Sequence, residues 1–170
     1  MPIYATRPDS TYEPCPEGLH HGVCVDVVDL GLVKGQYGEK HKIRIIWQVD
    51  QVNAETDRRF TVSKQYTLSM HEKSTLRKDL EGWRSRKFTD AELAPPGFDI
   101  EKLIGANCQL HVVHTLKDDG RIFGNVAAIV PPPKNVPKLV PLDYVRERDR
   151  KHSNGSGSHP GTSILDEVPF

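Results

Sequence analysis

The chain has 170 residues, and its 23 lysine and arginine residues equal its 23 aspartate and glutamate residues in number. This balance excludes a histone-like polycation, so any contact with nucleic acid must come from local clusters of charge. About 130 residues have the composition of a folded domain, which fits one domain with a modest core.

The first half of the chain predicts three strands. Four prolines in residues 1–18 indicate an extended N-terminal arm. Alternating apolar residues and β-branched residues then predict strands at 19–33, 39–50 and 59–70. Glycines between residues 31 and 38 mark the first turn, and residues 53–57 form a hairpin loop.

The period then changes from that of a strand to that of a helix. Leu76, Leu80 and Trp83 fall on one helical stripe, with Ser69 or Ser74 as its cap. Residues 98–104 predict a second, short helix. Strands are predicted at 107–116 and 121–130, joined by an Asp-Gly turn. Three prolines at 131–133 end the sheet, and residues 134–150 are expected along the surface.

Three strands, a helix and two strands is the order of the OB-fold, a five-stranded Greek-key barrel with its helix between strands three and four. SH3-like barrels and small α+β domains remain alternatives. We therefore expect an all-β domain with one helix over residues 19–131, after an arm at 1–18. A linker at 132–163 and an acidic tip at 164–170 follow it.

The C-terminal segment has the composition of a tethered docking peptide. Residues 151–163 contain no apolar residue to bury, so we expect a flexible, disordered tail that spans roughly 20 Å. The tip then combines two carboxylates with a terminal aromatic ring, and its proline lowers the entropy cost of presenting that ring. A polar terminus without a role is the alternative. The predicted docking residues are Asp166, Glu167, Val168, Pro169 and Phe170.

This tip is similar to the acidic, Pro-Phe-ending tail of bacterial single-stranded DNA-binding proteins, where it docks replication and repair enzymes. A second likeness is carried by residues 64–69 (Lys-Gln-Tyr-Thr-Leu-Ser), 71–77 (His-Glu-Lys-Ser-Thr-Leu-Arg) and 83–86 (Trp-Arg-Ser-Arg). Through these stretches, roughly residues 16–131 resemble phage-encoded single-strand-binding proteins. The resemblance implies an OB-fold that binds single-stranded DNA in replication, recombination or repair. It also implies a bacterial host cytoplasm if the protein is phage-encoded.

Side-chain parity along strand 39–50 predicts where nucleic acid lies. Positions 43, 45, 47 and 49 are apolar and face one way, whereas Lys40, Lys42 and Arg44 face the other at a spacing of about 7 Å. Such a row suits a backbone with one negative charge per nucleotide, and the middle strands are the usual OB-fold platform. A solvated face whose lysines protect a sheet edge is the alternative.

Base stacking needs exposed aromatic rings, and three residues are candidates. They are Tyr37 in the first turn, Tyr66 and Phe123. The parity of Tyr66 leaves open whether its ring is partly buried. Trp47 and Trp83 have the parity of core residues. Five further cations are candidates for the interface: Arg58, Arg59, Lys64, Arg84 and Arg86. For the arginines beside the hairpin loop and after the helix, ordinary surface charge is the alternative.

No pattern of residues predicts catalysis or a bound cofactor. Cys108, His111 and His114 do not converge on a strand, and the odd number of cysteines argues against a disulfide framework. No phosphate loop or nucleophile elbow is present. No stretch approaches the ~18 apolar residues of a membrane span, so we expect a cytoplasmic protein.

The expected function is sequence-independent binding of single-stranded DNA, with replication or repair proteins recruited by the tip. Two rivals stay open. One is an OB-fold interaction module or recombination mediator with weak or no DNA binding, and the other is a nuclease or enzyme accessory domain. The sequence leaves open whether the protein forms a homo-oligomer.

Overall fold

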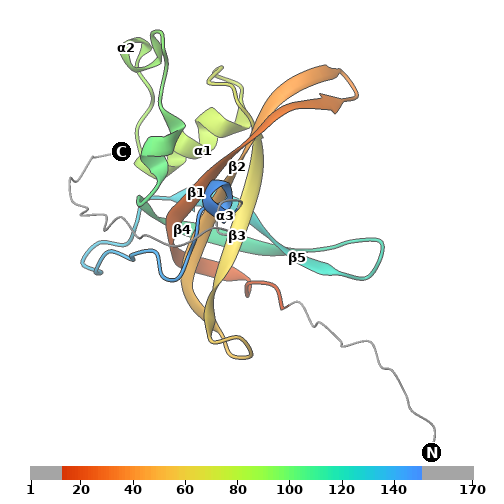
Figure 1. Ribbon diagram of the computed structural model, residues 1–170. Coiled ribbons are helices and arrows are strands. Elements are labelled where there is room, and N and C mark those ends of the chain that lie inside the picture. Colours follow the sequence, from red (N-terminus) through yellow and green to blue (C-terminus); the bar gives the residue numbers. More distant parts are fainter. Residues whose placement is uncertain (1–12, 151–170) are drawn as a thin grey trace, which may run out of the picture.

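The computed structural model describes residues 13–150. Within this range the chain forms five strands, three α-helices and one 3-10 helix (Figure 1). In chain order they are β1 (Gly18–Gly35), β2 (Gly38–Asn53), β3 (Arg58–Thr67), α1 (Thr75–Arg84), α2 (Asp90–Leu93), η1 (Ile100–Leu103), β4 (Asn107–Leu116), β5 (Ile122–Val130) and α3 (Glu147–Arg150). No helix within this range has the length and apolar character needed to cross a membrane.

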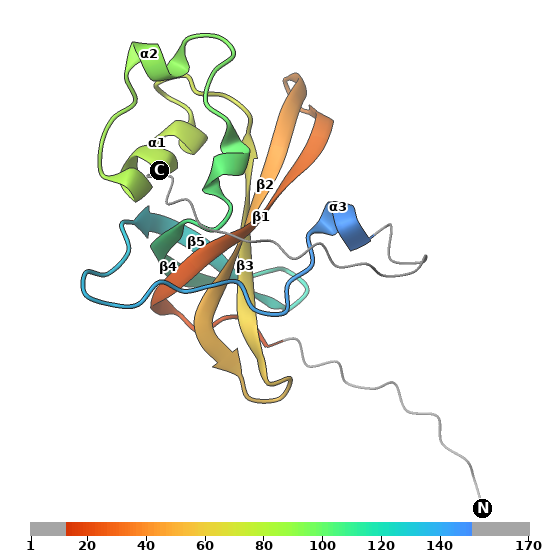
Figure 2. The same cartoon turned by 60° about the vertical axis from the view of Figure 1, so that its left-hand side comes forward.

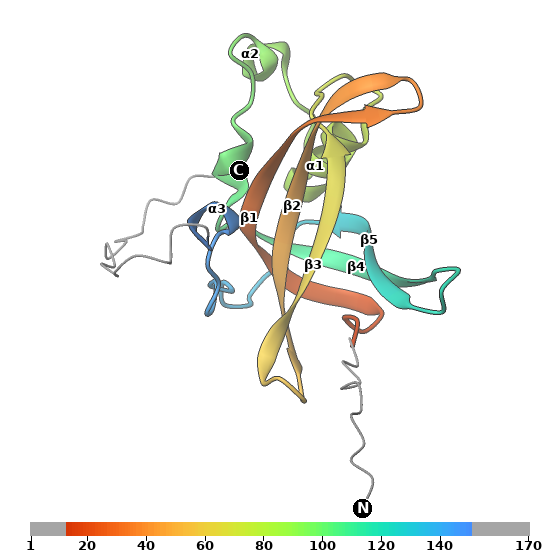
Figure 3. The same ribbon diagram turned by 45° about the vertical axis from the view of Figure 1, so that its right-hand side comes forward.

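The five strands form one antiparallel sheet in the order β3-β2-β1-β4-β5. The long strand β1 pairs with β4 over residues 18–23 and with β2 from residue 22 onward, so the sheet bends along it. The pair β2–β3 therefore crosses the pair β4–β5 at a steep angle (Figures 1 and 3).

The sheet does not close into a barrel. Its edges are β3 and β5, and no ladder joins them within residues 13–150, so the predicted barrel closure is not confirmed. The edges nevertheless contact each other, and α1, which follows β3 in the chain as predicted, contacts both. The helix thus packs where the sheet is open.

The sequence of α1 explains its limits and its buried face. Ser74 caps it by accepting a hydrogen bond from the Arg77 N–H at 3.2 Å, and Ser85 ends it in a left-handed conformation. Leu76, Leu80 and Trp83 are its buried residues, which confirms the predicted stripe.

The core lies between α1 and the inner face of the sheet. All four apolar positions of β2 predicted to share one face, Ile43, Ile45, Trp47 and Val49, are buried there. The rings of Trp47 and Trp83 pack 6.0 Å apart, so the prediction that both are core residues is confirmed. The three cysteines are buried and free.

The face of β1, β2 and β3 that points away from the core is called the outer face. A β-bulge in β1 changes which side chains reach it. Cys24 pairs with Trp47, but Asp26 pairs with Ile46, so the extra residue Val25 shifts the register by one. Cys24 therefore joins the core, whereas Asp26 points to the outer face.

Residues 131–150, which we call the strap, cross this outer face. They run from the end of β5 in front of the sheet to α3 (Figure 2). Hydrogen bonds join the strap to residues of β1, β2, β3 and β4. The segment predicted to lie along the surface thus follows one particular path over the strands.

Candidate functional site

The predicted cation row lies on the outer face of β2. Lys40 is exposed, and Lys42 and Arg44 are half-buried between buried core positions of the same strand. Within residues 13–150, no hydrogen bond or ion pair occupies any of these three side chains. Their charge is therefore not neutralised by a carboxylate of the described domain, so the row can attract an anion.

An aromatic ring lies at the end of this row. Tyr37, in the turn between β1 and β2, is 86% exposed. It lines an open hollow of about 180 Å³ together with Lys40 and Lys42. The remaining lining residues are Val33, Gly35, Gln36 and Gly38. The hairpin thus brings a ring and two ammonium groups together, the combination that stacks a base and holds its phosphates.

The neighbouring strand β3 adds uncharged polar groups to the same face. Lys42 pairs with Thr67, and Arg44 pairs with Gln65, whose neighbour on this face is Ser63. Ser63 and Gln65 are exposed. Cations flanked by hydroxyl and amide groups can hold a phosphodiester backbone without repelling it.

Phe123 lies apart from this row, on the β4–β5 hairpin. Its half-buried ring has the Lys117 ammonium 4.2 Å and the Arg121 guanidinium 5.8 Å from its centroid. The β1–β2 and β4–β5 hairpins project from the sheet as two separate arms (Figure 3). Phe123 and Tyr37 therefore belong to different arms of the domain.

Lys64 and Tyr66 face the opposite side of β3, toward α1. The Tyr66 hydroxyl donates a hydrogen bond to Asp79 at 2.7 Å, and the Lys64 ammonium meets the same carboxylate oxygen at 2.8 Å. Burial, and after it the Asp79 charge, raises the pKa of the Tyr66 hydroxyl well above its ordinary value. Since Tyr66 is 3% exposed, the predicted stacking and phosphate roles have no support from these positions.

Besides Arg44, four arginines were predicted at the interface, and two of these four make contacts inside the protein. The Arg84 side chain is 1% exposed, pairs with Glu92 at 2.7 Å and stacks on the Phe88 ring. Arg59 Nη1 donates a hydrogen bond to the carbonyl of Val140 in the strap. Arg58 and Arg86 are exposed, and no contact within residues 13–150 occupies their side chains.

Two carboxamides that the sequence did not single out hold the strap. Asn107 Nδ2 donates to the Leu139 carbonyl at 3.0 Å, and its Oδ1 accepts from the Leu139 N–H at 2.7 Å. Gln48 forms the same two bonds with Leu142: its Nε2 donates to the Leu142 carbonyl at 2.7 Å, and its Oε1 accepts from the Leu142 N–H at 2.9 Å. Both carboxamide residues pair with Val23, so they form one row across β4, β1 and β2.

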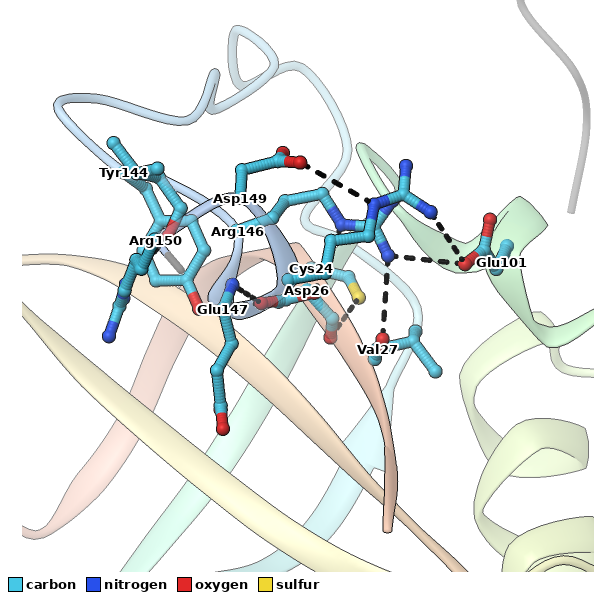
Figure 4. A network of polar contacts seen from close by, with 11 residues as sticks. Cys24, Asp26, Val27, Glu101, Tyr144, Arg146, Glu147, Asp149 and Arg150 are labelled. Atoms are coloured by element: carbon cyan, nitrogen blue, oxygen red, sulfur yellow. Dashed lines mark hydrogen bonds and ion pairs between the residues drawn. The ribbon is translucent and has the colours of Figure 1, made fainter. Parts of the chain in front are cut away.

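The carboxylate of Asp26 anchors the end of the strap (Figure 4). It accepts hydrogen bonds from the Tyr144 hydroxyl at 3.0 Å, from Arg146 Nε at 3.0 Å and from the Glu147 N–H at 2.8 Å. Arg146 also pairs with Glu101 at 3.2 Å. Polar residues inside apolar strand sequences, such as Asp26 between two valines, are the sequence signal for such an anchor.

The Asp26 anchor is ionised at neutral pH. Burial alone raises the pKa of the Asp26 carboxyl, but the three hydrogen bonds outweigh burial and hold the pKa below its ordinary value. A carboxyl with a lowered pKa stabilises the folded state above its unfolded-state pKa of about 3.9, and this stabilisation is lost as the pH falls through the folded-state pKa. Acid therefore loosens the strap only below about pH 4.

No metal-binding cluster is found in the described part of the chain. No group of three or more His, Cys, Asp or Glu residues among 13–150 is placed to hold a metal ion. Cys108 is buried in the core, whereas His111 is exposed. His114 Nε2 donates a hydrogen bond to the Cys15 carbonyl at 2.7 Å.

The predicted docking residues Asp166, Glu167, Val168, Pro169 and Phe170 lie outside the described residues. Most of the predicted N-terminal arm, residues 1–12, also lies outside them. Comparison of the sequence with protein-family models and with curated proteins finds no match.

Proposed function

We propose that this protein binds single-stranded DNA without regard to base sequence. The observation that carries the proposal is the unneutralised row of Lys40, Lys42 and Arg44 on the outer face of β2, with the exposed Tyr37 ring at its end. Cations attract the phosphates of any strand, and a ring stacks on any base, so this pairing of groups gives affinity without reading base edges.

We further propose that the domain is an OB-fold whose barrel is open between β3 and β5. The strand order, the position of α1 after β3, and the contacts of α1 with both edge strands support this assignment. In an OB-fold the face carrying the middle strands binds nucleic acid, and β2 with its cation row belongs to that face.

A labelled oligo-dT titrated with the full chain tests the proposed function. We expect saturable binding that weakens with salt, and weaker binding of a duplex that offers no free bases to stack. An oligonucleotide that is shortened when Mg²⁺ is added indicates a nuclease instead.

The second candidate is an OB-fold module that binds proteins and contacts DNA weakly or not at all. It is favoured by the strap, because the outer face already holds an extended peptide through its backbone. Absence of oligo-dT binding supports this candidate.

The Tyr37→Ala variant tests the stacking role of the hairpin. We expect oligo-dT affinity to fall about tenfold, because one base–aromatic stack contributes ~1–3 kcal/mol. Thermal stability should stay unchanged because the ring is 86% exposed. The matched Tyr66→Phe variant should show the reverse, a loss of stability of about 1 kcal/mol with unaltered DNA binding. Equal DNA affinities for wild type and Tyr37→Ala exclude stacking on this ring.

We also propose that the last six residues dock partner enzymes of replication or repair. This proposal stands on the two carboxylates and the Val-Pro-Phe sequence of the tip. Deletion of residues 165–170 is expected to leave oligo-dT affinity equal or tighter and to abolish capture of a partner. Titration of oligo-dT with the full chain and with the truncated chain in parallel measures this. Loss of DNA binding in the truncated chain contradicts a separate docking role.

A further inference from the structure

The cation row on β2 ends where the strap crosses that strand. Outward-facing positions of β2 continue from Arg44 through Ile46 to Gln48, at about 7 Å per step. Gln48 is only 4% exposed because Leu142 of the strap lies on it. The open part of the row therefore reaches from the hollow beside Tyr37 to Arg44 and stops before Gln48.

Hydrogen bonds at three positions hold the strap on one path across the sheet. The carboxamides of Asn107 and Gln48 each form two hydrogen bonds with one strap residue, one to its carbonyl and one from its N–H. The Asp26 carboxylate accepts three hydrogen bonds from the C-terminal end of the strap. In the middle of the strap, the side chains of Val140 and Leu142 point outward, since they are 64% and 52% exposed. The strap thus covers Val23, which is fully buried on the outer face.

We propose that the strap is a wall that ends the DNA-binding groove at Gln48 and sets how many nucleotides one protein molecule covers. Asp26, Gln48 and Asn107 are then positioning residues that act through the strap. This inference rests on the proposed function. A strand that follows Lys40, Lys42 and Arg44 must leave β2 before the wall and pass over the polar residues of β3, instead of continuing across β1 and β4.

The test releases the strap from its own side, so that the sheet stays intact. The double variant Tyr144→Phe and Arg146→Ala removes two of the three donors to Asp26. Arg148→Ala is the control, because it removes the same charge from a neighbouring residue that is 61% exposed and does not contact Asp26. Asp26→Asn provides a second route to the same release.

Two quantities are measured on the full chain. Hydrogen exchange at the Leu139 and Leu142 amides reports whether the strap has left, and we expect it to become about tenfold faster in both release variants. Calorimetric titration with poly-dT gives the number of nucleotides covered per protein. Opening β2 to Gln48 adds about 14 Å of groove, so we expect about two to four more nucleotides.

Each outcome decides the proposal. Faster exchange with a larger site in the release variants, and neither change in Arg148→Ala, supports the wall. Faster exchange with an unchanged or smaller site overturns it, and unchanged exchange shows that Asp26 does not position the strap. A wild-type protein that does not bind poly-dT overturns the proposed function itself, a result that is visible before any variant is compared.

Discussion

The triple variant Lys40→Ala, Lys42→Ala and Arg44→Ala is expected to bind oligo-dT about 100-fold more weakly than the wild type at about 0.1 M salt. Each phosphate contact to a single strand contributes about 0.7 to the slope of log K against log salt, which is roughly fivefold per contact at this concentration. Removing three contacts should also flatten the slope by about 2. Fluorescence anisotropy of a labelled oligonucleotide at several salt concentrations measures both effects.

A charge-matched control separates the row from the overall charge of the protein. Lys78 on α1 and its neighbours Lys73 and Lys87 in the flanking loops are exposed, and no contact within residues 13–150 engages their side chains. Alanine at all three should leave affinity within about twofold of the wild type, because these cations are not on the outer face. Equal losses in the two triple variants imply that DNA is attracted by net charge alone, and the assignment of the interface to β2 is then wrong.

Trp83→Ala is expected to lower the free energy of unfolding by about 3–5 kcal/mol. The ring is 2% exposed, packs against Trp47 and donates a hydrogen bond from Nε1 to the Asn107 carbonyl at 2.8 Å. Its loss leaves a cavity between α1 and the sheet and an unpaired carbonyl at the start of β4. The total free energy of unfolding of a small domain is about 5–15 kcal/mol. The urea concentration at the unfolding midpoint, followed by circular dichroism, should therefore be much lower than in the wild type.

The Trp83→Phe variant distinguishes packing from the hydrogen bond. It keeps an aromatic ring in the core but lacks the indole N–H, so we expect a smaller loss than for alanine. A Trp83→Ala protein with wild-type stability contradicts the packing of α1 between the two sheet edges. The buried Trp83 ring has no contact with DNA in this account. A loss of oligo-dT affinity in a folded Trp83→Phe protein would therefore contradict it.

Much of the fold follows from periodicity that the sequence displays. Alternation along β2 correctly separates the core residues Ile43, Ile45 and Trp47 from the three cations, because the strand pairs regularly over this stretch. The stripe of α1 is equally clear, since a helix that packs on a sheet must bury one face. These predictions depend only on local geometry, which the order of residues determines.

The remaining features depend on contacts that are distant in sequence. The bulge at Val25 reverses the parity of Asp26, and a strict period of two cannot show where an extra residue enters a strand. The parity of Tyr66 leaves its burial open, and the contact that decides it is distant in sequence. Asp79 on α1 accepts hydrogen bonds from both Tyr66 and Lys64, so both side chains face the helix. Glu92 of α2 pairs with Arg84 and buries its side chain.

The strap was the largest feature that the sequence did not reveal. Its proline-rich and charged composition resembles that of a linker, and nothing local indicates that Gln48 and Asn107 bind its backbone. The carboxamide pairs form only when β4, β1 and β2 lie side by side, so the path of the strap is a consequence of the folded sheet. The proposed limit of the DNA groove therefore comes from tertiary structure.

The salt dependence of oligo-dT binding by the wild-type protein tests the central claim most directly. The account predicts measurable binding in dilute buffer and a slope of log K against log salt of about −2 or steeper, one increment for each cation of the β2 row. Absence of binding at the lowest salt concentration, or binding that salt does not weaken, would contradict the claim that this face holds single-stranded DNA.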